Sequence, residues 1–198
     1  MKNQKQGLST GMYVLIGVGV LVLLLLLWGI GSYNGLISSD ETVNEKWGNV
    51  QADYQRRADL IPNLVATVQE NTKYEGDVLK EITRARSAWT DARTQAEKID
   101  AAQQVDSTIS KLLLVAENYP QLRATESFIS LQDELAGTEN RIKFSRTEFN
   151  AAVKTYNQNV RRFPGNIVAG MFGFDTKASF AANAGAENAT NVKVAFNS

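Results

Sequence analysis

The sequence predicts an all-α protein, with a single N-terminal transmembrane helix followed by a long antiparallel four-helix bundle that packs like a coiled coil. Residues 12–30 are almost wholly apolar, which is typical of a membrane span. Residues 47–68 carry apolar side chains at steps of three and four, which places them on one face of a helix. Residues 128–163 repeat a large apolar side chain every seven positions, the period of left-handed helix packing.

The composition excludes several classes of site. The 198 residues include 21 basic and 21 acidic side chains, but no cysteine and no histidine. A balanced charge offers no basic surface, so we expect no nucleic-acid partner. Without cysteine or histidine, thiol nucleophiles, disulfides, imidazole bases and the usual zinc or haem ligands are ruled out. We therefore predict no catalytic residue, no metal site, no cofactor and no enzymatic activity.

The first element is a transmembrane anchor over residues 12–31, preceded by a short polar N-terminus, residues 1–11. No charged residue occurs between Lys5 and Asp40. As a helix, the apolar run would be roughly 28 Å long, which is close to the thickness of the hydrocarbon core of a bilayer. The anchor should therefore contact membrane lipid.

Residues near the ends of this run bear on whether it is a retained membrane anchor or a cleaved signal peptide. Tyr13 and Trp28 lie where amphipathic rings favour the membrane interface. Gly29 and Gly31 leave open a cleaved signal peptide, because small residues precede such cuts. The apolar region of a signal peptide has roughly 7–15 residues, so the longer run here favours a retained anchor.

A helical bundle is expected over residues 33–164, with little linker after the anchor. The apolar face of its first helix comprises Trp47, Val50, Tyr54, Ile61, Leu64, Val65 and Val68. Leu36 and Val43 continue the same face toward the anchor. Pro62 lies inside the run and cannot donate to the carbonyl of Ala58, so it either bends the helix or starts a new one.

Charged residues lie between these apolar positions. Arg56 and Asp59 have the spacing of a helical ion pair, which fits a solvated face. Alternatively, Arg56, Arg57 and Asp59 form a partner-docking patch beside the proline, together with Pro62 and Asn63.

A second helix is expected over about 74–96 and a third over about 98–118. The second has one apolar face, formed by Val78, Ile82, Ala85, Trp89 and Ala92. Gly76 weakens its start, so a break between residues 71 and 77 is expected. Residues 95–100 give a poor break signal, so the two helices are either continuous or offset. Tyr119-Pro120 ends the third helix, because the residue before proline is pushed out of helical geometry.

The fourth helix has the clearest pattern. The residues of its seven-residue repeat are Phe128, Leu135, Ile142, Phe149, Tyr156 and Phe163. A second row is formed by Leu131, Thr138, Ser145, Ala152 and Val160. Five heptads give a helix of roughly 53 Å, ended by Pro164-Gly165. An aromatic stripe at this spacing indicates a packed core rather than a cofactor site.

Three blocks, in this order, resemble the signature of the LemA family of bacterial membrane-anchored helical proteins. They run from Tyr-Asn-Gly-Leu at 33–36 through Arg-Arg-Ala-Asp-Leu-Ile-Pro-Asn-Leu-Val at 56–65, then 117–122, then 163–174. The resemblance covers about 33–180 and implies an N-terminal membrane anchor and an antiparallel helical bundle. It implies no established catalytic activity, so it supplies no active-site residues.

Residues 165–180 form an apolar segment rich in glycine and phenylalanine. Its candidate interaction residues are Ile167, Met171, Phe172, Phe174 and Phe180, the last expected to expose its ring. The segment either folds back over one end of the bundle or docks onto another subunit, another protein or the lipid surface. Residues 181–198 are expected to be a flexible tail, in which 192–196 alternate like a short strand and hint at assembly.

Two functions fit these features. The first is a non-catalytic scaffold or adaptor in the bacterial cell envelope, acting through the bundle and the C-terminal apolar contacts and assembling with itself or a membrane-protein partner. The alternative is a regulatory subunit of a membrane-associated envelope-stress or proteolytic system. Lys2 and Lys5 precede the span, while Asp40 and Glu41 are the first charges after it. The positive-inside rule therefore places the N-terminus in the cytoplasm and the bundle outside.

Overall fold

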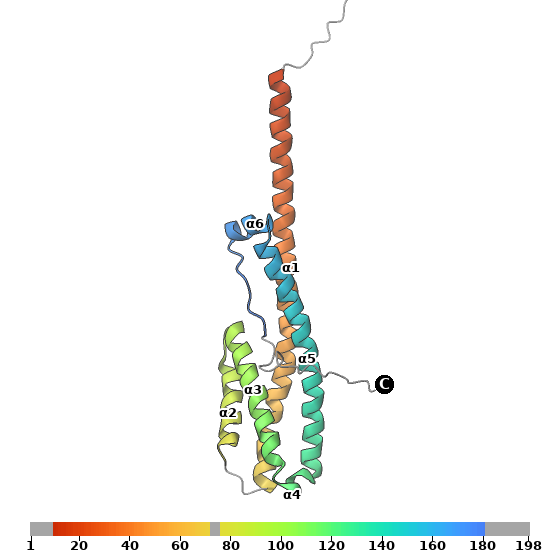
Figure 1. The fold of residues 1–198 in the computed structure, drawn as a ribbon, viewed down its shortest axis with the longest axis vertical. Helices are drawn as coiled ribbons and strands as arrows, with labels where there is room; N and C mark the ends of the chain where they lie inside the picture. The colour runs from red at the N-terminus through yellow and green to blue at the C-terminus, as the bar shows by residue number, and fades with distance from the viewer. Residues whose placement is uncertain (1–9, 72–75, 181–198) are drawn as a thin grey trace, which may run out of the picture. The chain divides into compact units, whose positions relative to one another are not determined.

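The computed structural model describes residues 10–71 and 76–180. The helices there are α1 (Thr10–Asn71), α2 (Asp77–Asp91), α3 (Gln95–Ala116), α4 (Pro120–Arg123), α5 (Glu126–Arg161) and α6 (Gly165–Phe172) (Figure 1). No strand occurs in these two ranges, which confirms the all-α prediction. The suggested strand at 192–196 and the tail 181–198 lie outside the described residues.

The described residues divide into two compact units. The first holds residues 10–51 and 151–177, and the second holds 52–150, without 72–75, together with 178–180. Helices α1 and α5 each run through both units.

The N-terminal part of α1 is the predicted membrane span. Among the described residues, α1 is the helix long and apolar enough to cross a membrane. Its most apolar stretch of 18 residues has a mean hydropathy of 2.8, and none of that stretch is buried against the rest of the protein. The glycines Gly29, Gly31 and Gly35 do not interrupt the helix. The predicted direct passage from the anchor into the bundle is therefore confirmed.

Helix α1 also continues through Pro62, close to its C-terminal end, so a new helix does not start there. A proline leaves the carbonyl four residues earlier without its helical donor. Here that carbonyl belongs to Ala58, which is buried, and it accepts a hydrogen bond from Nε of Arg86 on α2 at 3.3 Å. The Arg86 side chain thus replaces the backbone donor that Pro62 lacks.

We expect Arg86→Met to lower the free energy of unfolding by about 1–2 kcal/mol, because the Ala58 carbonyl would be buried without this donor. In a Pro62→Ala background the restored backbone N–H can take over, so the same substitution should cost less. Urea unfolding of the detergent-solubilised full-length protein, arranged as a double-mutant cycle, measures the difference. Equal costs in both backgrounds would show that Arg86 stabilises the bundle by another contact.

Helices α2 and α3 are separate, which decides between the two alternatives left by the sequence. Thr94 forms the N-cap of α3: its hydroxyl accepts from the backbone N–H of Glu97 at 3.2 Å. The Glu97 carboxylate accepts in return from the N–H groups of Arg93 at 2.8 Å and Thr94 at 3.1 Å. These donors, Arg93 first, hold the pKa of Glu97 below its ordinary value. This reciprocal capping box starts a new helix.

Helix α5 follows the predicted seven-residue repeat over 36 residues, about 54 Å. Phe128, Leu135, Ile142, Phe149 and Tyr156 are all buried. The prediction was wrong for Phe163, which is 79% exposed. It lies beyond Arg161, where α5 ends, so the helical period no longer decides which way its side chain points.

Within each unit, a side chain of α5 binds the backbone of the segment that follows α6, residues 173–180. In the first unit, the Asn157 side chain accepts from the backbone N–H of Lys177 at 2.8 Å and donates to its carbonyl at 2.9 Å. In the second unit, Asn150 does the same for Phe180, at 3.0 and 3.1 Å. Two side chains of α5 thus hold the backbone of the segment that follows α6.

Candidate functional site

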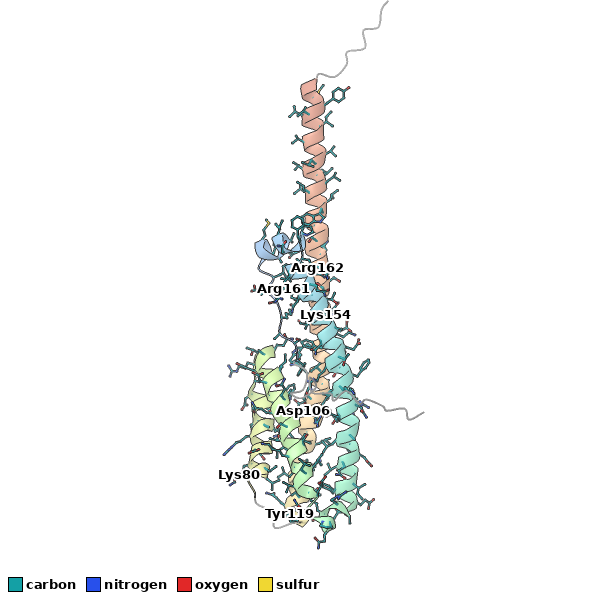
Figure 2. The ribbon with its side chains drawn as sticks, in the orientation of Figure 1. Lys80, Asp106, Tyr119, Lys154, Arg161 and Arg162 are labelled. Atoms are coloured by element: carbon teal, nitrogen blue, oxygen red, sulfur yellow. The ribbon has the colours of Figure 1, made fainter. Side chains whose placement is uncertain are left out.

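A polar cluster in the second unit joins three helices of the bundle, and we call it the charge cluster. It consists of Tyr54 and Arg57 on α1, Asp106 on α3, and Glu139 and Arg146 on α5. Figure 2 labels Asp106, the residue that most of the others contact. The Tyr54 hydroxyl donates to Oδ2 of Asp106 at 2.8 Å. Arg57 pairs with Asp106 at 3.3 Å and with Glu139, while Arg146 pairs with Asp106 at 3.5 Å.

Burial governs the protonation of this cluster. Burial raises the pKa of Asp106 above its ordinary value, against the opposing effects of the Arg57 guanidinium and the Tyr54 hydroxyl. Burial, together with the charge of Asp106, also raises the pKa of Tyr54 well above its ordinary value. Tyr54 is therefore a neutral hydrogen-bond donor at every physiological pH.

The charge cluster is suited to fixing the helices rather than to turnover. Both oxygens of Asp106 face cationic or hydroxyl partners, and the Arg57 side chain is only 6% exposed. The described residues include no group of three or more acidic side chains able to hold a metal ion. A carboxylate so enclosed sets which residues of α1, α3 and α5 face one another.

The proposed docking patch on α1 divides in two. Arg57 is buried in the charge cluster, whereas Arg56, Asp59, Pro62 and Asn63 are exposed. Among the described residues Arg56 forms no ion pair with Asp59, so that prediction was wrong; Asp59 accepts a hydrogen bond from Gln55 at 2.8 Å instead. Arg57 and Asp59 therefore have different roles, although both were predicted to belong to one docking patch.

The seam spacing could have revealed the burial of Arg57. Seam positions advance by alternating steps of three and four, and Arg57 falls on that series between Tyr54 and Ile61. Its charge left two positions open, on a face toward water or toward a neighbouring helix, and the structure shows the second. Asp106, which pairs with it, was not singled out, because no local pattern in α3 distinguishes it from the other acidic residues.

The predicted contact residues of the segment 165–180 differ in their exposure to solvent. Ile167, Met171 and Phe172 on α6 are exposed, and Phe174 is half-buried. Phe180 is only 3% exposed, so the expectation of an exposed ring was wrong.

In the second unit, Phe180 completes an aromatic cluster. Its ring is stacked on Tyr54 at 6.2 Å between centroids and meets Phe149 edge-on at 5.9 Å. The Arg146 guanidinium lies 4.6 Å from the ring centroid. The ring therefore covers one side of the charge cluster. A lone aromatic residue outside a helix carries no periodic signal, so the sequence could not place it.

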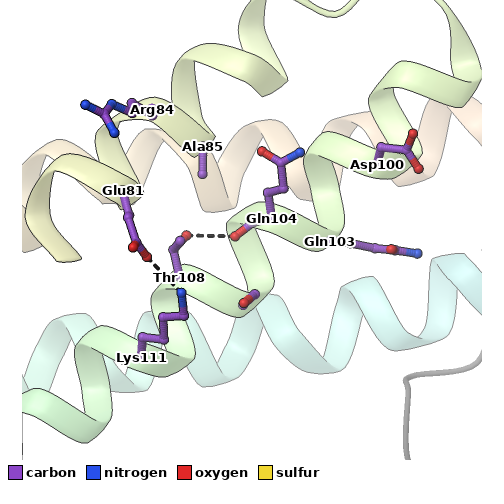
Figure 3. Close-up of a pocket in the computed structure, with 9 residues that line it drawn as sticks. Glu81, Arg84, Ala85, Asp100, Gln103, Gln104, Thr108 and Lys111 are labelled. Atoms are coloured by element: carbon purple, nitrogen blue, oxygen red, sulfur yellow. Dashed lines mark hydrogen bonds and ion pairs between the residues drawn. The ribbon is translucent and has the colours of Figure 1, made fainter. Parts of the chain in front are cut away.

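A polar groove of about 610 Å³ lies between α2 and α3 (Figure 3). Glu81 and Lys111 pair across it at 2.8 Å. The Thr108 hydroxyl on its wall donates to the carbonyl of Gln104, at 2.7 Å, within its own helix. With its hydroxyl engaged in this way, Thr108 is not set up as a nucleophile beside a base. The groove offers a surface for polar contacts.

Sequence comparisons place the chain among known proteins. Magnetosome protein MamQ 2 of Paramagnetospirillum magneticum is 23% identical over 168 residues, which are 72% of this chain and 62% of that protein. Magnetosome protein MamQ of Magnetospirillum gryphiswaldense is 22% identical, with the same coverage. Protein LemA of Metamycoplasma hominis is 22% identical over 141 residues, 71% of this chain and 64% of that protein.

The chain thus spans less than two thirds of the length of these relatives. The apolar span of α1 and these matches together indicate a membrane-associated protein. The model of the LemA family matches residues 46–196, which is most of the chain. The chain therefore belongs to the LemA family.

Proposed function

We propose that the protein is a non-catalytic scaffold or adaptor, anchored in the bacterial cell membrane, that acts through its bundle and through α6. The continuity of α1 is the observation that carries this proposal. The apolar span and the first bundle helix are one uninterrupted helix, whose later residues Tyr54, Ile61 and Leu64 are buried in the core of the second unit. The bundle cannot leave the membrane unless the span is pulled out of the lipid.

The exposed residues of α1 supply the protein-binding surface in this proposal. Arg56, Asp59, Pro62 and Asn63 are exposed, and the charge cluster does not use them. We propose that this surface contacts a second copy of the chain or another membrane protein. The basic residues Lys2 and Lys5 before the span support a cytoplasmic N-terminus, with the bundle on the opposite side.

The test is the size and composition of the detergent-extracted full-length protein, measured by light scattering and mass spectrometry. We expect a discrete homo-oligomer, or a complex with one membrane protein, which Arg56→Glu dissociates. Lys143→Glu makes the same change of charge on an exposed position of α5 and should leave the complex intact.

Other outcomes separate the remaining possibilities. A bare monomer without partners would overturn the scaffold proposal. One enzyme present in fixed stoichiometry would favour a regulatory subunit of an envelope-stress or proteolytic system. Turnover by the purified chain alone, abolished by a single carboxylate substitution, would overturn the non-catalytic assignment.

A further inference from the structure

Helix α6 packs against the part of α1 where the apolar span ends. Both segments belong to the first unit. The Tyr33 ring contacts Phe172 at 4.8 Å and Phe174 at 5.8 Å between ring centroids. Beside these contacts lies a groove of about 420 Å³ between the two helices. Its walls include Leu25, Trp28 and Tyr33 of α1 and Ile167, Met171 and Phe172 of α6. They are almost entirely apolar.

The position of this groove matches the boundary of a bilayer. From Leu25 to Tyr33, α1 advances about 12 Å. The interfacial layer on each side of the hydrocarbon core is roughly 5–8 Å thick. A groove that begins within the apolar span and ends past Trp28 therefore reaches from the hydrocarbon into the headgroup layer. Met171 is 74% exposed and Phe172 59% exposed beside it. Such side chains are favoured in lipid rather than in water.

Positive charge lies at the same end of the span. Arg161 ends α5 and Arg162 follows it, before α6 begins at Gly165 (Figure 2). Both are exposed, and neither forms an ion pair with an acidic side chain of the described residues. Arg162 lines a second groove, of about 320 Å³, together with Ser32 and Asn159. No acidic residue occurs between 149 and 174, or between Lys5 and Asp40. A guanidinium beside a hydroxyl and an amide is complementary to a phosphate.

We propose that α6 is a second membrane contact, which lies in the bilayer interface and binds anionic phospholipid. The acyl region covers Ile167, Met171 and Phe172 and enters the apolar groove, while the headgroup phosphate binds Arg162 and Ser32, with Arg161 adding attraction. This inference rests on the proposed membrane anchor. It makes the lipid surface, rather than a second protein, the occupant of the apolar face of α6.

The absence of cysteine from the chain permits a direct test with single spin labels. Full-length protein would be labelled at Met171→Cys, at Leu23→Cys within the span, or at Lys80→Cys on α2. Each would be placed in vesicles of equal parts phosphatidylglycerol and phosphatidylcholine. We expect the Met171 label to collide more with oxygen than with a water-soluble nickel chelate, as the Leu23 label does. The Lys80 label should show the reverse.

Three results would overturn the proposal. A Met171 label that behaves like the Lys80 label, while the Leu23 label stays in lipid, would refute the α6 contact and leave the anchor intact. An aqueous Leu23 label would refute the anchor itself. Strong spin–spin broadening between Met171 labels would show that a second copy of the chain covers α6.

The headgroup contact has its own test. Phosphatidylglycerol retained by the extracted full-length protein would be measured by mass spectrometry, relative to phosphatidylcholine. We expect Arg161→Gln with Arg162→Gln to reduce this enrichment by about tenfold, since each basic residue near an anionic surface strengthens binding several-fold. Lys143→Gln with Lys154→Gln removes the same charge from exposed positions of α5 and should leave the enrichment unchanged. Equal enrichment in both double variants would overturn the role of the arginines.

Discussion

Replacing Asp106 with alanine is expected to lower the free energy of unfolding by about 3 kcal/mol. The substitution removes the acceptor of the Tyr54 hydroxyl and one of the two anionic partners of the buried Arg57. The cost arises mainly from the cation left behind in a buried position. Removing one partner of a buried ion pair costs about 3–5 kcal/mol. The loss should lie at the lower end of this range, because Glu139, whose side chain is 58% exposed, still pairs with Arg57.

Urea unfolding of the detergent-solubilised full-length protein, followed by circular dichroism, measures this change. Asp59→Ala is the control, because Asp59 is exposed on the same helix as Arg57, and it should change the free energy of unfolding by less than about 0.5 kcal/mol. Equal losses in the two variants would show that the charge cluster does not stabilise the bundle.

Asp106 should also make the free energy of unfolding depend on pH. Because burial raises the pKa of Asp106 in the folded chain, the folded state binds its proton more tightly than the unfolded state. This contribution is fully present below the unfolded pKa, about 3.9, and is lost as the pH rises through the folded pKa. The unfolding free energy of the wild type relative to Asp106→Asn should therefore fall as the pH rises above about 4. A difference that grows with pH would contradict this assignment.

Phe180→Ala is expected to lower the free energy of unfolding by about 3–4 kcal/mol, because the ring fills space between Tyr54 and Phe149 that would become a cavity. The same unfolding measurement applies. Phe144→Ala is the matched control, since that ring on α5 is 70% exposed and its loss should cost little. A silent Phe180→Ala variant would show that residues 178–180 do not pack on the bundle in solution.

Patterns that repeat along a helix made the main architecture predictable. The seven-residue repeat predicted α5 from Phe128 to Tyr156, and the apolar run predicted the span at the start of α1. Each prediction rests on many residues that agree with one another, so a single exception does not change it. Phe163 has the seven-residue spacing, but it lies after the end of α5. The spacing predicts a buried side chain only within the helix.

Features that depend on single contacts were harder to predict. The break between α2 and α3 is an exception, because Thr94 and Glu97 have the local spacing of a capping box. Asp106 depends on a partner 49 residues earlier, Arg57, and on the register between helices. Phe180 depends on Asn150, 30 residues earlier. No local pattern records contacts between residues so far apart in the chain.

The two asparagines of α5 have a consequence for how the chain can vary. Asn150 and Asn157 bind only backbone atoms, so they place no demand on the side chains at positions 180 and 177. Any residue except proline supplies the backbone N–H from which each asparagine accepts. The identity of the residues at positions 177 and 180 is therefore left to their other contacts.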